Sequence, residues 1–153
     1  MIKRFERFSF AISELSRYWH KLTSDEMHRH GLRGTHSVYL MTLLRFPEGL
    51  SAIRLSELCG KDKADVSRMI SIMEAQGMVK KVSTGQNVYR CNYKLTESGM
   101  NAALQVRTRA MYAVQMAGRD MTDEEREIFY KGLESIAFNL KELCKTGIPD
   151  EIK

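Results

Sequence analysis

The stretch KDKADVSRMISIMEAQGMVKK, residues 61–81, decides the fold because it holds a short amphipathic helix that stops sharply. Val66, Met69, Ile70 and Met73 recur at i, i+3, i+4 and i+7, which is the spacing of one buried helical face. The glycine in AQGMV then ends the pattern, since glycine commonly follows the last turn of a helix. This spacing predicts a helix whose opposite face is exposed.

The exposed start of that helix is basic. Its polar side chains are Lys61, Lys63, Ser67 and Arg68. Asp62 is expected to cap the helix, with Asp65 as its partner three residues later. Residues 61–94 carry seven basic and three acidic side chains, whereas residues 95–153 carry eight basic and ten acidic ones. This clustering favours a polyanion as the binding partner.

A second short helix precedes the first. SAIRLSELCG, residues 51–60, is expected to begin at Ser51, to bury Leu55 and Leu58, and to end at Gly60. Residues 51–76 therefore read as helix, tight turn and helix. This is the helix-turn-helix arrangement, in which the second helix is presented outward.

A β-hairpin is expected after Gly77, because the apolar period changes from 3.6 to 2. MVKKVS (78–83) and VYRCNYKL (88–95) are the predicted strands, joined by a turn at TGQN (84–87). One face of the second strand would carry Val88, Arg90, Asn92 and Lys94, and the other Tyr89, Cys91, Tyr93 and Leu95. A hairpin in this place forms the wing of a winged helix.

Longer helices are predicted on both sides of this module. The first covers about five turns and carries an apolar seam of Phe5, Phe8, Ile12, Leu15, Trp19 and Leu22. Ser24 and Asp25 resemble a new cap, and Thr35 is expected to cap a helix that runs to Phe46. After the hairpin, Thr96 and Glu97 begin another long helix.

The last helix is expected to start at a capping box made by Thr122 and Glu125. Its apolar seam consists of Phe129, Leu133, Ile136, Leu140 and Leu143. Both terminal seams could pack on the central module of the same chain. Alternatively, they form the interface of a symmetric homodimer through Phe5, Phe8, Ile12 and Leu15 together with the seam of the last helix.

Composition narrows the class of protein. The 153 residues contain no apolar run near the ~20 needed to span a bilayer and no secretory signal, so we expect a cytoplasmic protein. Cys59, Cys91 and Cys144 are odd in number and far apart, which excludes a disulfide framework. His28 and His30 lack metal-ligand spacing, and no catalytic motif is present. We therefore expect no metal, no cofactor and no enzymatic activity.

The order of three segments resembles the MarR family of bacterial winged helix-turn-helix transcription regulators. These are GLRGTHSVYLMTLL (31–44), LSELCGKDKADVSRMISIMEAQGMVKK (55–81) and YKLTESG (93–99), and the similarity covers residues 10–145. The resemblance implies a mainly α fold with a small β-hairpin wing. It assigns residues 31–95 to the DNA-binding domain, 1–30 and 96–146 to dimerisation helices, and 147–153 to a tail.

The family also implies function: a homodimer that binds pseudo-palindromic operators in double-stranded DNA, usually as a repressor, and is released by a small effector. The DNA-binding residues of this chain would then be Ser51, Lys61, Lys63, Asp65, Ser67, Arg68, Arg90, Asn92 and Lys94. Arg68 and Lys63 can reach base edges or phosphates, while Ser51 and Lys61 would hold the DNA backbone. A winged-helix protein-interaction module without specific DNA binding is the alternative.

Two positions depart from the family pattern. Asp65 stands where many members have a small hydroxyl residue, and it is either the cap partner of Asp62 or a reader of a cytosine amino group. At the wing, the usual Asp-x-Arg falls on Asn87, Val88 and Tyr89, so its arginine is missing or shifted to Arg90.

An effector cleft is expected between the dimerisation helices and the winged domain, as in the family. Trp19, His20, His36, Tyr39 and Met111 could line it, or they could be ordinary core residues. Family members that sense peroxide carry a cysteine near the first helix, and none is present there. Buried, unreactive thiols are therefore the expectation for this chain.

Overall fold

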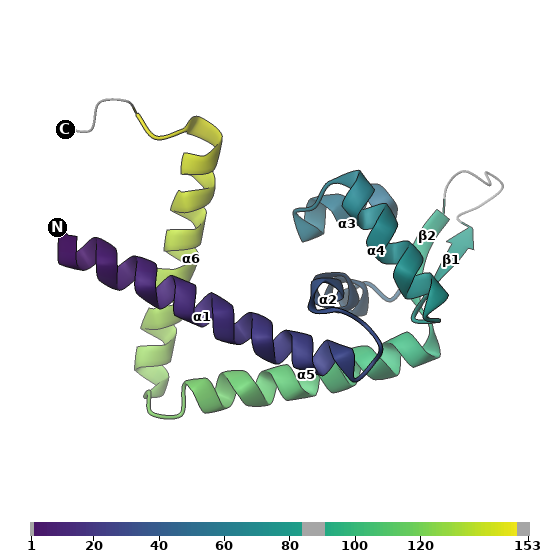
Figure 1. The fold of residues 1–153 in the computed structure, drawn as a ribbon, viewed down its shortest axis with the longest axis horizontal. Helices are drawn as coiled ribbons and strands as arrows, with labels where there is room; N and C mark the ends of the chain where they lie inside the picture. Colours follow the sequence, from purple (N-terminus) through teal and green to yellow (C-terminus); the bar gives the residue numbers. More distant parts are fainter. Residues whose placement is uncertain (1, 84–90, 150–153) are drawn as a thin grey trace. The chain divides into compact units, whose positions relative to one another are not determined.

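The computed structural model of the chain describes residues 2–83 and 91–149, which form two compact units, Met1–Met111 and Tyr112–Lys153. The elements, shown in Figure 1, are α1 (Ile2–His28), the 3-10 turn η1 (Gly34–His36), α2 (Ser37–Arg45), α3 (Ala52–Cys59), α4 (Lys63–Ala75), β1 (Val79–Ser83), β2 (Cys91–Leu95), α5 (Glu97–Ala117) and α6 (Asp123–Thr146). The predicted fold class is confirmed: mainly α, with a small β-hairpin.

The first unit has one apolar core, to which α2, α3 and α4 all contribute next to the hairpin (Figure 1). The predicted face of α4 lies in it: Val66, Ile70 and Met73 are buried, and Met69 is half-buried. The other core residues are Met27, Leu32, Tyr39, Leu40, Leu43, Leu50, Leu55, Val79, Ala103 and Val106. Burial of this face fixes which side of α4 remains exposed.

The turn between α3 and α4 is built from local capping signals. The Oγ of Ser51 accepts the backbone N–H of Arg54 at 3.3 Å, and Gly60 ends α3 in the left-handed conformation with φ 62°. Leu55 is fully buried, but Leu58 is 42% exposed, so the prediction that both point inward was wrong for Leu58. The buried face of this short helix follows Ala52, Leu55 and Cys59 instead.

The hairpin begins directly after α4. β1 and β2 pair antiparallel with Val79 opposite Leu95 and Lys80 opposite Lys94, and Leu50 adds an isolated bridge to Tyr93. The predicted turn at 84–87 and the residues Val88, Tyr89 and Arg90 lie outside the described residues. The described hairpin is therefore the base of the predicted wing.

The LTESG segment joins the hairpin tightly to α5. The Thr96 hydroxyl donates to the carbonyl oxygen of Gly77 at 2.6 Å and accepts the backbone N–H of Gly99 at 3.0 Å, which caps the predicted helix. Gly99 is buried, and a Cβ there would collide with the Met78 carbonyl group. Only glycine permits this approach of helix and strand.

Two predicted caps in the N-terminal half were wrong. Ser24 and Asp25 do not start a new helix, because α1 continues to His28 and buries Glu26 and Met27 at its end. Thr35 does not cap α2, which instead follows η1. The Thr35 hydroxyl lies 3.8 Å from the Met69 Sδ.

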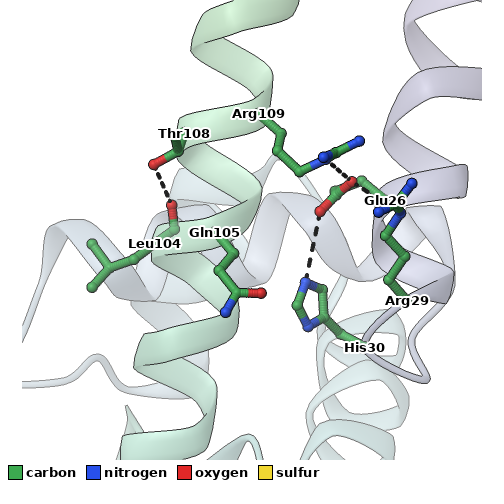
Figure 2. A pocket seen from close by; sticks show the side chains of 7 residues that line it. All are labelled: Glu26, Arg29, His30, Leu104, Gln105, Thr108 and Arg109. Atoms are coloured by element: carbon green, nitrogen blue, oxygen red, sulfur yellow. Dashed lines mark hydrogen bonds and ion pairs between the residues drawn. The ribbon is translucent and has the colours of Figure 1, made fainter.

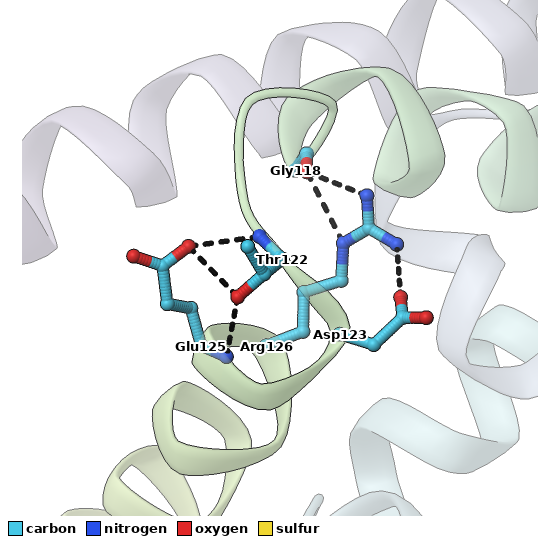
Figure 3. Close-up of polar contacts among 5 residues, drawn as sticks. All are labelled: Gly118, Thr122, Asp123, Glu125 and Arg126. Carbon is cyan, nitrogen blue, oxygen red and sulfur yellow. Dashed lines mark hydrogen bonds and ion pairs between the residues drawn. The ribbon is translucent and has the colours of Figure 1, made fainter.

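The second unit contains α6, whose predicted capping box is confirmed (Figure 3). The Thr122 Oγ accepts the Glu125 N–H at 3.2 Å, and the Glu125 carboxylate accepts the Thr122 N–H at 2.8 Å, which lowers the pKa of Glu125. Arg126 donates to the Gly118 carbonyl oxygen at 2.8 and 3.1 Å. Unlike α4, α6 contains no buried residue. No helix in the described ranges is long and apolar enough to cross a membrane.

Candidate nucleic-acid interface

The exposed start of α4 carries a group of cations on a well-packed helix. Lys61, Lys63, Ser67 and Arg68 are all exposed, whereas Val66 and Ile70 of the same turns are buried. Lys61 and Lys63 form no ion pair with any residue that the structure describes. The positive end of the helix dipole lies at the same place, where the Asp62 carboxylate already caps it, so the attraction for an external anion rests mainly on the cations.

Asp65 is held by two neighbours and does not complete the predicted capping box. Its backbone N–H donates to the Asp62 carboxylate at 2.8 Å, so Asp62 caps α4 as expected. The Asp65 carboxylate accepts the Tyr39 hydroxyl at 2.8 Å and the Arg68 Nη2 at 3.4 Å. The side chain therefore faces α2 and Arg68 rather than returning to the cap.

Tyr39 supports this end of α4 from the core, and His36 is buried beside it in the chain. Tyr39 is fully buried, and both burial and its bond to Asp65 raise the pKa of its hydroxyl. His36 is 1% exposed; its Nδ1 lies 3.0 Å from the Arg33 N–H, and its buried Nε2 has no partner in the described part of the chain. Burial lowers the pKa of His36, which favours the neutral form of the ring.

The base of the wing adds a second group of cations. Lys80 and Lys94 are directly opposite each other in the hairpin register, and neither forms an ion pair among the described residues. Like charges directly opposite destabilise a hairpin, so the pair favours an anion nearby. Lys80 was not among the predicted DNA-binding residues, because only the strand register of the structure places it opposite Lys94.

The other predicted DNA-binding residues are placed as follows. The Asn92 Nδ2 donates to the Gly49 carbonyl oxygen at 3.4 Å, which turns the amide toward the loop before α3. Ser51 caps α3, while its hydroxyl keeps a hydrogen to donate. Arg90 lies outside the described residues. Thus α4 collects Lys63, Asp65, Ser67 and Arg68, and Lys94 stands apart on the hairpin.

The terminal seams are largely exposed to solvent in the single chain. The exposed fraction of the residue is 70% for Phe5, 56% for Leu15 and 47% for Leu140. Phe8, Ile12, Phe129, Ile136 and Leu143 are exposed as well, and Leu133 is half-buried. Apolar faces of this length need a covering surface in water.

A cavity of about 710 Å³ lies in the first unit beside the end of α1 (Figure 2). Its lining residues are Glu26, Arg29, His30, Leu104, Gln105, Thr108 and Arg109. The buried Glu26 forms an ion pair with Arg109, and its carboxylate lies 3.5 Å from Arg29 Nε and 3.8 Å from His30 Nε2. Arg29 and His30 are helical neighbours of Glu26, but Arg109 is 83 positions away, and no sequence pattern points to that pair.

The residues predicted to line an effector cleft are not brought together in this cavity. His36 and Tyr39 are buried in the core, whereas Trp19, His20 and Met111 are exposed on α1 and α5. The expectation of buried thiols was wrong for Cys144, which is exposed, whereas Cys59 and Cys91 are half-buried. Cys59 is half-buried, its Sγ lies 3.5 Å from the Thr42 hydroxyl, and burial raises the pKa of its thiol.

Comparison with known proteins gives matches at the level of structure. No model of a known protein family and no curated protein matches the sequence. A solved MarR family transcription regulator matches with a TM-score of 0.81 and 16% identity over 95% of this chain and 97% of its own. A MarR regulator from Methanosarcina mazei Go1 gives a TM-score of 0.77 and 22% identity over 90% and 99%.

A third match is MepR from S. aureus, solved in complex with DNA. Its TM-score is 0.77, and its identity is 16% over 86% of this chain and 97% of its own. At such identities the likeness concerns the fold, and it extends over nearly the whole of both chains. This chain therefore has the winged helix-turn-helix fold of the MarR family of transcription regulators.

Proposed function

We propose that this protein is a sequence-specific DNA-binding transcription regulator that binds a pseudo-palindromic operator as a homodimer. The observation that carries the proposal is the start of α4, where Lys61, Lys63 and Arg68 are exposed on the side opposite a buried face. In a helix-turn-helix protein, that end of the second helix enters the major groove. The fold likeness to MepR, which was solved with DNA, supports the same reading.

The proposed contacts divide into two kinds. Arg68 reads a base edge from the major groove, with Ser67 and Lys63 beside it. Ser51, Lys61 and the Lys80–Lys94 pair hold phosphates and fix the register of the protein on DNA. Asn92 and Arg90 extend this contact along the wing.

The homodimer is the second part of the proposal. Its support is the exposed apolar seams of α1 and α6, which a second copy of the chain would cover. In this reading residues 1–30 and 96–146 dimerise, and residues 31–95 bind DNA. Two copies of α4 then meet successive turns of the major groove, about 34–36 Å apart.

Repression, and release by a small effector, complete the proposed function. A repressor needs only to occupy its operator, which a DNA-bound dimer does. The cavity beside Glu26 and Arg109 is a candidate place for an effector, because a ligand there would touch both α1 and α5. Movement of these helices would change the spacing of the two α4 helices in the proposed dimer.

Binding to a randomised duplex pool tests the main proposal. We expect several rounds of selection to enrich an inverted repeat with half-sites one helical turn apart. Fluorescence anisotropy on the enriched duplex should show affinity falling steeply with salt, because bound phosphates release counterions. Weak, unselective binding at low salt would instead favour a winged-helix protein-interaction module.

Arg68→Ala then tests the assigned recognition helix. We expect at least a tenfold loss of affinity for the enriched duplex, about 1.4 kcal/mol, with the dimer intact. Arg119→Ala is the matched control. Arg119 is also exposed, and its substitution removes the same charge from a position outside the DNA-binding domain. Equal losses for both variants would show that only net charge matters.

A further inference from the structure

We propose that Tyr39 and Asp65 are positioning residues which hold Arg68 in the conformation that reads a guanine. This inference rests on the proposed function and adds to it the base that Arg68 recognises and the residues that orient it. The hydroxyl of Tyr39 donates to one oxygen of Asp65 at 2.8 Å, and the other oxygen accepts Arg68 Nη2 at 3.4 Å. A line of bonds thus runs from the core of the protein to the exposed arginine.

The pair of Asp65 and Arg68 would be weak without Tyr39. The Arg68 side chain is 70% exposed and lies three residues from Asp65 on the same helix, and such exposed pairs hold a long side chain poorly. Asp65 is different from an ordinary surface acid, because only 26% of its side chain is exposed. It therefore has little freedom once a bond from the core fixes it.

Tyr39 supplies that bond from a rigid place. The residue is fully buried in α2, and 26 positions separate it from Asp65 along the chain. Its hydroxyl is the polar end of a packed aromatic ring, so it cannot move without disturbing the core. The Asp65 backbone is also fixed, because its N–H donates to the Asp62 cap.

The geometry leaves Arg68 free to recognise one kind of base. A guanidinium has five N–H donors, and the bond to Asp65 uses Nη2. The remaining donors can form the paired hydrogen bonds to O6 and N7 of guanine that arginine makes in the major groove. The carboxylate beside Arg68 repels a phosphate, which directs the arginine toward a base edge instead.

The test uses the duplex enriched by selection and variants of each residue. Arg68→Ala first identifies the base pair at which discrimination is lost. We expect Tyr39→Phe and Asp65→Asn each to reduce discrimination at that G·C pair by about three- to tenfold. Neither change should reduce it further in the Arg68→Ala background, because both residues act through Arg68.

Two matched variants separate positioning from other effects. Tyr93→Phe also removes a partly buried hydroxyl in the same domain, so it reports the effect of a weakened fold. Glu57→Gln removes an exposed acid that accepts a hydrogen bond from Arg54 at 2.5 Å, and it changes the net charge as Asp65→Asn does. Both controls should change affinity for all duplexes alike and leave discrimination at the G·C pair unchanged.

NMR relaxation of the Arg68 Nε–H in the DNA-free protein gives a second readout. We expect this side chain to become more mobile in Tyr39→Phe and to be unaffected in Glu57→Gln. Unchanged discrimination and unchanged Arg68 mobility in Tyr39→Phe, with a wild-type protein that selects an inverted repeat, would overturn this inference alone. A wild-type protein that selects no sequence would overturn the proposed function, and the base reading with it.

Discussion

Helices α4 and α6 both carry a regular apolar face, but only the face of α4 is buried within the chain. In α4, which has 13 residues, Val66, Ile70 and Met73 are buried in the core of the first unit. In α6, which has 24 residues, no residue is buried, although its seam is longer. Most helical stability in proteins comes from packing of such a face.

The difference shows which apolar faces are covered by residues of the same unit and which are not. The winged domain closes its core within one chain, so the exposed side of α4 is available for a ligand. The seam of α6 requires a surface that lies outside its own unit. A second copy of the chain is the partner that we propose, and the following experiments test this contrast.

Charged residues in the α6 seam should have the largest effect. We expect Ile136→Asp combined with Leu140→Asp to convert the dimer into a monomer, measured by sedimentation equilibrium. Operator affinity should fall on the order of 10²–10⁴-fold, because each half-site is then bound without help from the other. The winged domain should keep its fold.

Lys131→Asp is the control for this change, because Lys131 lies on the opposite face of α6 and is exposed. It should leave the dimer intact. A double seam variant that still sediments as a dimer would remove α6 from the interface.

A substitution that creates a cavity in the core of the winged domain should have the next largest effect. It should change the stability of the domain and not the association of two chains. We expect Leu55→Ala, at a fully buried position, to lower the free energy of unfolding by about 2–5 kcal/mol in urea titrations at fixed protein concentration. Ile53→Ala on the same helix should cost much less, since Ile53 is 58% exposed. If the two variants lost similar stability, α3 would not be packed as described.

Sequence reasoning succeeded where the signal was local. The period of Val66, Ile70 and Met73 and the caps at Ser51, Asp62 and Thr122 involve neighbours within one or two helical turns. It failed at Ser24 and Asp25, because a local cap signal competes with burial at the end of α1, and burial prevailed.

The candidate site was harder to predict for the same reason. The basic residues at the start of α4 were evident, but the partner of Asp65 lies in another helix, and no local pattern points to Tyr39. Lys80 became visible only with the strand register. The pair of Glu26 and Arg109 joins residues 83 positions apart in the chain, so only a folded structure reveals that cavity.

Acid should weaken the winged domain through His36. Burial lowers the pKa of His36 below its ordinary value of 6.5, so the unfolded chain binds this proton first. The stabilisation is complete above pH 6.5 and declines as the pH falls toward the folded-state pKa, by at most ~1.4 kcal/mol per pH unit.

Urea titrations between pH 7.5 and 5.5 would measure this slope. We expect a flatter profile for His36→Asn, whose side chain can still accept the Arg33 N–H. His20→Asn is the matched control, because His20 is exposed on α1, and its profile should follow that of the wild type. The same steep slope in His36→Asn would assign the acid sensitivity to another group.

Helix caps give the smallest effect and the finest comparison of the two regions. Thr122→Ala removes the capping box of α6, and Asp62→Ala removes the cap of α4. A lost cap costs ~1 kcal/mol, equivalent to about fivefold faster amide exchange in the first turn.

We expect hydrogen exchange to quicken by that factor at the start of α6. It should quicken less at the start of α4, because Val66 is buried one turn later and holds that helix in place. Equal acceleration at both sites would mean that α6 is held at its start as firmly as α4, and the contrast between the two helices would then apply only to the seam beyond Phe129.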